Sequence, residues 1–422
     1  MNTTLWHNTI LTRCQQAKNI GIYGFLIFLP CSIAFSQMCL GLFALTIIVE
    51  SILTRRFPFP HTPLNRPLFA YLAITLIATV FSVDVGKSID GLEGILVISV
   101  FYLFYYSVKD MSHLKKFVGV LVCAMAVAAL YGVIQYYLEV DIFRLKRPIS
   151  FLKHVNDDLT APVRVSGFFS IYMTFSAQLA MMFPIMCALI VSVRSVSKKV
   201  FLGISLLLTG FALLWTYTRS AWIGVLCALV VCASLQGKKW SLLFLILLLL
   251  PGILFLQPEL LDRSLSMFRE HDEERPYTLI TTIDMIRDYP LTGIGKGNYS
   301  RVVVPYRERR YPDFEFSSRA HAHNNLFQVT AEGGLFSGFC FLWLWWVIFR
   351  EVYRAYHKSL KKHNMEKWLA LGFLGAIVAF FIQGFFDYNF GDSESAMMMW
   401  LIVAVSFKLQ TLAASPNMPN HS

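Results

Sequence analysis

A pair of histidines, His321 and His323, offers the clearest acid–base chemistry in the sequence. A neutral imidazole near pH 7 is the natural general base, so His323 is the candidate catalytic residue. A single histidine at a helix start is more often a cap or a surface residue, and that alternative stays open here. Asn324 or Asn325 is suited to cap the helix expected to follow. Glu332 lies further along, either as a functional carboxylate or as a residue that makes a structural hydrogen bond to another span.

The His-x-His spacing also raises the question of a metal site. On a strand the two rings would face one way without a third ligand in register, and on a helix they would point roughly 200° apart. The eight cysteines lie mostly in apolar runs, and none forms a Cys-x-x-Cys pair, so we expect neither a zinc site nor a disulfide framework. The sequence shows no P-loop. We therefore expect no metal and no cofactor.

Three arginines, Arg164, Arg219 and Arg275, could bind an anion, because a guanidinium recognises phosphate through two parallel hydrogen bonds. Arg219 joins two apolar runs with almost no polar linker. An arginine there either has a functional partner or extends its side chain to the lipid headgroups. Arg275 lies at the start of an expected amphipathic helix over 276–289, where free backbone N–H groups would help to bind an anion. The alternative for Arg275 is a surface ion pair with the preceding glutamates.

Asp387 and a glycine-rich segment complete the polar features. Asp387 ends an apolar run and could pair with an arginine or hold a substrate hydroxyl; the alternative is a simple helix-end acid. The segment Gly293-Ile294-Gly295-Lys296-Gly297 only weakly matches a nucleotide-binding loop. It follows Pro290 rather than a strand, so we expect a tight turn.

The composition indicates a membrane protein. Of the 422 residues, 56% are hydrophobic and 15% are charged, and the mean hydropathy is +0.55. Soluble domains are nearer 45–50% apolar and about 25% charged, so a soluble enzyme and a disordered chain are both excluded. The net charge of +11 would suggest nucleic acid in a soluble protein. Here it indicates loops held on an anionic membrane face, and we expect no nucleic-acid partner.

Apolar runs long enough to cross a bilayer predict about twelve transmembrane helices in one all-α polytopic domain over 1–422. We expect them at 19–36, 38–53, 67–83, 91–108, 117–138, 170–192, 200–217, 220–236, 240–257, 326–349, 368–387 and 395–411.

Basic residues cluster in alternate connections, for example at Arg55–Arg56, Lys115–Lys116, Lys198–Lys199 and Lys361–Lys362. The positive-inside rule then places both termini in the cytoplasm. Two long connections, about 139–169 and 258–325, fall on the opposite face with the candidate residues. A large outer loop suggests chemistry on that face. A transporter of anionic solutes is the alternative class, but the sequence shows no internal repeat, and its charges gather at one face rather than at the midplane.

Five segments, in this order, resemble the O-antigen ligase and polymerase superfamily. His323-Asn324 followed by Glu332 and Gly334 is similar to the family's His-Asn…Gly-x-x-Gly signature, although Gly338 comes one residue late. The other four segments are Gly132-Val133-Ile134-Gln135, Arg164-Val165-Ser166-Gly167, Thr218-Arg219-Ser220-Ala221-Trp222, and Arg275 with Asp288-Tyr289-Pro290-Leu291-Thr292-Gly293-Ile294-Gly295. Ser220 replaces a family glycine.

The resemblance implies an all-helical, lipid-dependent glycosyltransferase of the bacterial inner membrane with a large periplasmic loop. Such an enzyme takes a glycan from undecaprenyl pyrophosphate, inverts the anomeric centre, and uses neither metal nor nucleotide. A ligase passes the glycan to a sugar hydroxyl of the lipid A-core in lipopolysaccharide biosynthesis. Carried onto this chain, Arg219 and Arg275 would hold the pyrophosphate, His323 would activate the acceptor hydroxyl, and Asp387 would support them.

Two other activities of the same family stay open. A polymerase would extend a lipid-linked glycan, and a protein O-oligosaccharyltransferase would modify Ser or Thr. Enzymes of the second kind usually carry a longer loop or an additional C-terminal region, whereas only eleven residues follow Thr411 here. We expect the ligase.

Overall fold

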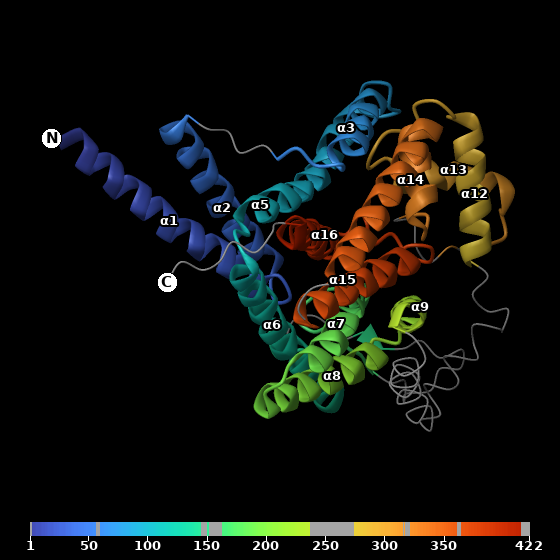
Figure 1. Cartoon of the computed structure of the whole chain (residues 1–422). Coiled ribbons are helices and arrows are strands. Elements are labelled where there is room, and N and C mark those ends of the chain that lie inside the picture. Colours follow the sequence, from blue (N-terminus) through green and yellow to red (C-terminus); the bar gives the residue numbers. More distant parts are fainter. Residues whose placement is uncertain are drawn as a thin grey trace.

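The protein is a helical bundle, seen in the computed structural model of Figure 1. The structure describes residues 2–55, 60–144, 150–151, 163–236, 274–314, 316, 321–360 and 364–414. The helices are α1 (Asn2–Phe28), α2 (Ile33–Thr54), α3 (Asn65–Val80), α4 (Val85–Gly91), the 3-10 helix η1 (Leu92–Ile98), α5 (Ser99–Ser107), α6 (Met111–Leu138), α7 (Tyr172–Ser192), α8 (Val196–Trp215), α9 (Arg219–Gln236), α12 (Glu274–Asp288), α13 (Tyr299–Arg310), α14 (Asn325–Ser359), α15 (Asn364–Gln383) and α16 (Ser393–Ala414). Two short strands, β1 (Ser150–Phe151) and β2 (Val163–Arg164), pair antiparallel.

Nine helical segments among the described residues are long and apolar enough to cross a membrane. The all-helical, multi-pass membrane class expected from the composition is therefore confirmed. Helix α3 covers most of the expected span 67–83, but it has only 16 residues. The span expected at 240–257 lies outside the described residues.

The break between the first two expected spans is displaced, and the span 19–36 is wrong. Helix α1 ends at Phe28, and the chain turns before α2 begins at Ile33. Pro30 lies in this turn, where its ring and missing N–H end a helix. The Ser32 side chain then caps α2 by accepting from the Phe35 N–H. Hydropathy alone could not locate this turn, because apolar residues continue through it.

The centre of the bundle is formed by α7, α15 and α16, whose residues are almost all buried. Helices α7 and α15 approach closely at glycines. A Cβ on Gly372 would lie 2.9 Å from the Ile185 Cα, and one on Gly375 would lie 2.8 Å from the Pro184 Cβ. Small residues permit such close contacts between membrane helices. The middle of α15 is therefore packed tightly against α7.

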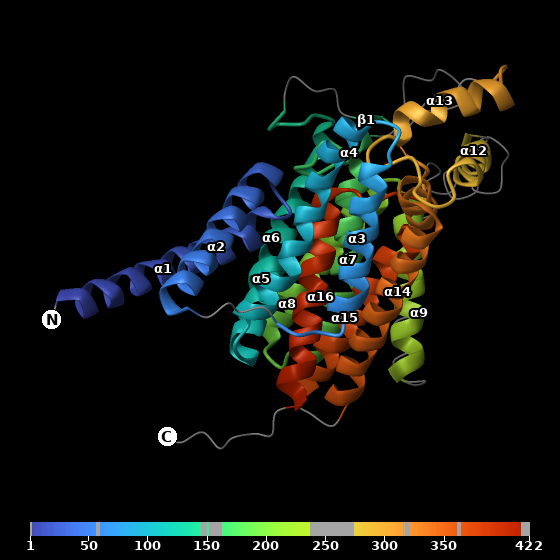
Figure 2. The same ribbon diagram turned by 90° about the horizontal axis from the view of Figure 1, so that it is seen from above.

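The longer connections gather at one end of the bundle. Figure 2 shows α4, β1, α12 and α13 together at this end, while the hairpin of α1 and α2 extends away from the remaining helices. Helix α12 rests on α13 through a hydrogen bond from the Arg307 guanidinium to the Thr278 hydroxyl (2.9 Å) and one between the Thr282 and Tyr299 hydroxyls (2.6 Å). We call this end the loop end of the bundle.

Candidate functional site

The turn before α14 holds both histidines at the loop end. His323 has a φ of 51°, in the left-handed region that a non-glycine residue rarely adopts. Its backbone N–H donates to the Nδ1 atom of His321 at 3.2 Å. Asn324 caps α14 by accepting from the Phe327 N–H at 3.1 Å, as expected from the sequence. Strain at the residue expected to act as base is typical of a functional site.

Asn325 connects this turn to the segment that follows α15. Its backbone N–H donates to the Gly384 carbonyl at 2.8 Å, and its side-chain amide donates to Asn389 at 2.7 Å. In return, its side-chain carbonyl accepts from the Phe390 N–H at 3.1 Å. A Cβ on Gly384 would collide with the Asn325 amide at 2.1 Å. These contacts bring Asp387 beside the histidines.

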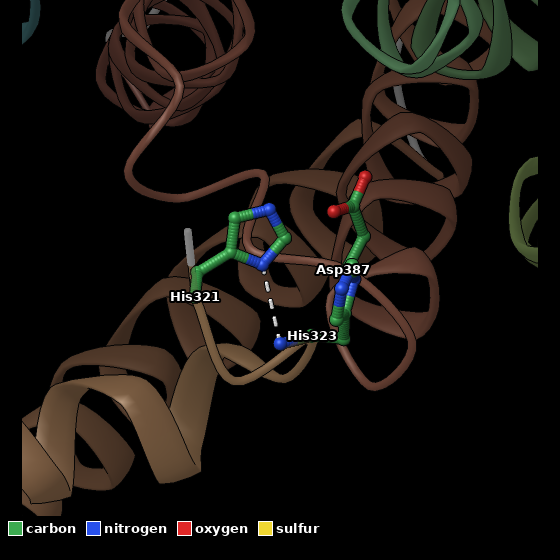
Figure 3. A group of neighbouring side chains, drawn as sticks. All are labelled: His321, His323 and Asp387. Atoms are coloured by element: carbon green, nitrogen blue, oxygen red, sulfur yellow. Dashed lines mark hydrogen bonds between the residues drawn. The ribbon is translucent and has the colours of Figure 1, made fainter. Parts of the chain in front are cut away.

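His321, His323 and Asp387 form one cluster (Figure 3). Their ligand atoms all lie within 4.8 Å of one another, and the two imidazole centroids are 4.3 Å apart. The cluster therefore has the donor set of a three-ligand cation site. From the sequence, a third ligand in register with the two histidines was not expected on a strand or a helix. Asp387, 64 residues after His323, takes this position in the structure. The absence of a metal stays a prediction.

The charge state of the cluster is set by burial and by Arg275. Burial, assisted by the positive charge of Arg275, lowers the pKa of His321 to about 4, so this imidazole is neutral near pH 7. Because its Nδ1 accepts a hydrogen bond, its proton resides on Nε2, and His321 can only donate there. Burial raises the pKa of Asp387 to about 6. The hydrogen bond from the Tyr388 N–H and the charge of Arg275 act in the opposite direction and lower this pKa. Arg275 thus acts on both residues, as its position at the start of α12 allows.

Arg219 lies at the same end of the bundle. Helices α9 and α15 are antiparallel, because Gly224 packs on the Ala379 carbonyl and the Cys232 thiol reaches the Leu371 carbonyl. When the same antiparallel register is extended to the start of α9, Arg219 lies level with Gly384, the residue that Asn325 contacts. Arg219 is 8% exposed.

Arg164 supports the turn that precedes Arg219. Its guanidinium donates to the Thr216 carbonyl at 3.1 Å and to the Tyr217 carbonyl at 3.2 Å, and it covers the Tyr172 ring. Tyr217 also adopts a left-handed φ of 51°. The Arg164 guanidinium is therefore engaged with the backbone of the turn that precedes Arg219.

The glycine-rich segment forms the expected tight turn and docks into a break in α14. Gly334 leaves helical geometry with a φ of 76°, which frees carbonyls of the preceding turn. The Ile294 and Gly295 N–H groups donate to the Ala331 and Glu332 carbonyls, each at 2.9 Å. The Glu332 carboxylate accepts from the Gly297 N–H at 3.0 Å. The Glu332 carboxylate thus fixes the loop against α14, whereas the alternative left open by the sequence was a hydrogen bond to another span.

Three residues were not assigned to the site from the sequence. His321 joins the cluster through the turn, Tyr388 follows Asp387 with its ring 6.0 Å from the His321 ring, and Lys296 lies in the docked loop. The His-x-His spacing could have indicated His321. Nothing local in the sequence indicates that Lys296 and Tyr388 meet.

Fold and site together define a multi-pass membrane protein with a histidine, arginine and carboxylate site at the loop end of its bundle. Residues 204–342, about a third of the chain, match the family model described as O-antigen ligase. The recognition of this family from the sequence motifs is confirmed, and its members transfer glycans. The matched range contains Arg219, Arg275, His323 and Glu332, whereas Arg164 and Asp387 lie outside it. A search of curated proteins finds no match.

Proposed function

We propose that this protein is an O-antigen ligase that transfers a glycan from undecaprenyl pyrophosphate to a sugar hydroxyl of lipid A-core at the periplasmic face of the bacterial inner membrane. The observation that carries this proposal is the convergence of His323, Asp387 and Arg275 at one end of a membrane bundle, in a chain whose residues 204–342 match the O-antigen ligase family. The interfacial position suits substrates anchored in lipid.

In the proposed reaction, His323 accepts the proton of the acceptor hydroxyl as its oxygen attacks the anomeric carbon. The bond from that carbon to the pyrophosphate oxygen breaks, and undecaprenyl pyrophosphate leaves with the electron pair. Arg275 and Arg219 stabilise the charge that develops on the leaving group. His321 does not compete for the proton, because its Nδ1 is already occupied by the His323 N–H. Attack opposite the leaving group inverts the anomeric centre, without a metal or cofactor.

The proposed topology places both termini in the cytoplasm and the loop end in the periplasm. It is supported by the alternation of basic residues and by the even number of spans, twelve, expected from the sequence. Reporter fusions that are active only outside the cytoplasm test it. A fusion after Arg310 is expected to be active and one after Thr411 inactive; the reverse pattern would contradict the topology.

Complementation tests the function in cells. A Gram-negative host without its own O-antigen ligase would carry the intact protein or a variant at matched expression, with lipopolysaccharide read as a ladder on gels. We expect the ladder with the intact protein and its loss with His323→Ala and Arg275→Ala. If the variants also restore the ladder, the site assignment is wrong. If only a host lacking its polymerase is complemented, the activity is polymerisation.

A further inference from the structure

A large cavity lies beside the catalytic cluster and takes no part in the chemistry described above. Its volume is about 880 Å³, within the range of roughly 300–1,000 Å³ typical of ligand sites. It is bounded by α2, η1 and α16 and by the loops that carry Lys296 and Tyr388. Tyr388 also borders the cluster, since it follows Asp387 directly and its ring centroid is 6.0 Å from that of His321. The cavity therefore ends next to the proposed reaction centre.

The floor of the cavity is polar. Lys296, Tyr388 and Glu332 all line it. Burial would lower the pKa of Lys296, but the neighbouring tyrosines and Glu332 outweigh burial and raise it, so the ammonium is held charged. The Tyr388 phenol hydrogen-bonds to this ammonium. The floor thus combines hydrogen-bond donors and acceptors in one place.

Part of the cavity wall is apolar and belongs to a candidate membrane span. Leu96 lines the cavity and is 71% exposed, within the membrane-spanning segment Val85–Ser107. Gly91 and Gly94 allow the loop that carries Lys296 to lie close to η1, because they have no side chain. A Cβ on Gly91 would lie 2.9 Å from the Lys296 carbonyl oxygen. Aromatic rings, including Trp400 and Phe390, complete the wall. Such a cavity suits a ligand with a polar head and an apolar anchor.

The charges around the cavity select the kind of head group. Among the described residues, three acidic residues and one lysine line the cavity: Asp90, Glu93, Glu332 and Lys296. A multiply charged pyrophosphate would meet repulsion here, whereas Arg275 and Arg219 offer it positive charge elsewhere. Sugar hydroxyls both donate and accept hydrogen bonds, so they match a mixed floor of ammonium, phenol and carboxylate. Aromatic side chains add apolar faces for sugar C–H groups.

We propose that this cavity seats a glycolipid, with sugar hydroxyls on Lys296, Tyr388 and Glu332 and the apolar anchor between α2, η1 and α16. The inference rests on the proposed function, because it makes this glycolipid the acceptor and leaves the donor pyrophosphate to the arginines. From this seat a sugar hydroxyl passes Tyr388 to reach His323.

A blocking variant tests the seat without touching the cluster. Gly41 of α2 lines the cavity, and a Cβ there would meet no atom within 4 Å, so Gly41→Phe places a ring in the cavity without a collision at the backbone. Gly119→Phe is the matched control, because Gly119 of α6 is equally open and lies outside the cavity. Binding of deep-rough lipopolysaccharide and of undecaprenyl pyrophosphate would each be measured on the full chain in detergent.

We expect Gly41→Phe to weaken lipopolysaccharide binding about 10-fold or more, a loss of ~1.4 kcal/mol, with pyrophosphate binding within about 2-fold of intact protein. Gly119→Phe is expected to change neither. The seat is wrong if the intact protein does not bind the lipopolysaccharide or if Gly41→Phe binds it normally. It is equally wrong if Gly41→Phe loses only the pyrophosphate, which would assign the cavity to the donor. Failure of the proposed function is distinct: Arg275→Ala would then bind undecaprenyl pyrophosphate as well as intact protein.

Discussion

At the scale of single residues, the site depends on two backbones held in unfavourable conformations and on carboxyl and imidazole groups with displaced pKa values. His323 and Tyr217 are both left-handed, which costs about 1–3 kcal/mol each. Burial moves the pKa of His321 down to about 4 and that of Asp387 up to about 6. At neutral pH the cluster therefore holds a neutral donor imidazole beside a carboxylate.

The raised pKa of Asp387 can be measured directly. Below about pH 6 the Asp387 side chain is the neutral acid, and above it the carboxylate. At pH 5 it is therefore protonated, whereas an exposed aspartate is ionised. Infrared spectra should show a protonated carboxyl band that appears as the pH falls through about 6 and is missing in Asp387→Asn. Transfer activity should also fall in this range. An Asp387 that titrates near 4 would show that it is solvated rather than buried.

Arg275 should contribute through its position rather than its charge alone. Loss of one well-placed donor at a developing anion costs roughly 10²–10³-fold in kcat, and we expect this of Arg275→Ala. Arg287→Ala is the matched control on the same helix, because Arg287 is exposed and its ion pair among the described residues is with Asp284 at 3.6 Å. Equal activity of the two variants would remove Arg275 from the site.

At the scale of elements, the docking of the glycine-rich loop into α14 organises the site. The break at Gly334 frees carbonyls that the loop then satisfies, and the Leu335 N–H donates to the Pro290 carbonyl at 2.8 Å. The glycine-rich loop and the kink in α14 therefore stabilise each other. Sequence reasoning found the turn, but it did not find the break in α14, because the expected span 326–349 runs without interruption through Glu332-Gly333-Gly334.

Gly334→Ala tests this dependence. A Cβ would lie 2.2 Å from the Leu291 carbonyl oxygen on a backbone with a φ of 76°. Left-handed strain and overpacking together should destabilise the protein by roughly 2–6 kcal/mol, seen as a lower unfolding temperature in detergent. Gly119→Ala, on an open helix surface, should leave stability equal or slightly higher. A Gly334→Ala protein as stable as the control would rule out the docked geometry.

At the scale of the whole molecule, the membrane class and most spanning helices could be predicted, since composition and long apolar runs determine them. The order of the motifs identified the family. The convergence of His323 with Asp387 could not be derived, because it depends on Asn325 contacting Gly384 and Asn389 across the fold. The cavity that Lys296 lines could not be predicted either, because its walls come from α2, η1 and α16, which are remote in sequence.

We also expect the protein to work without a metal, although the cluster has the donor set of a cation site. Arg275 lies close enough to shift both His321 and Asp387, and its charge opposes a dication there. Dialysis against a chelator should leave the transfer rate within about 2-fold of the untreated enzyme. Loss of activity that Zn²⁺ restores would mean that the three side chains hold a catalytic ion.

The most direct test of the central claim is transfer by the purified protein in lipid, from an undecaprenyl-pyrophosphate glycan to deep-rough lipopolysaccharide, comparing intact protein with His323→Ala. A general base contributes typically 10²–10⁴-fold. We predict ligated product with the intact protein, a loss of at least about 100-fold in His323→Ala, and unchanged binding of undecaprenyl pyrophosphate. No product with the intact protein, or comparable product with the variant, would contradict the account.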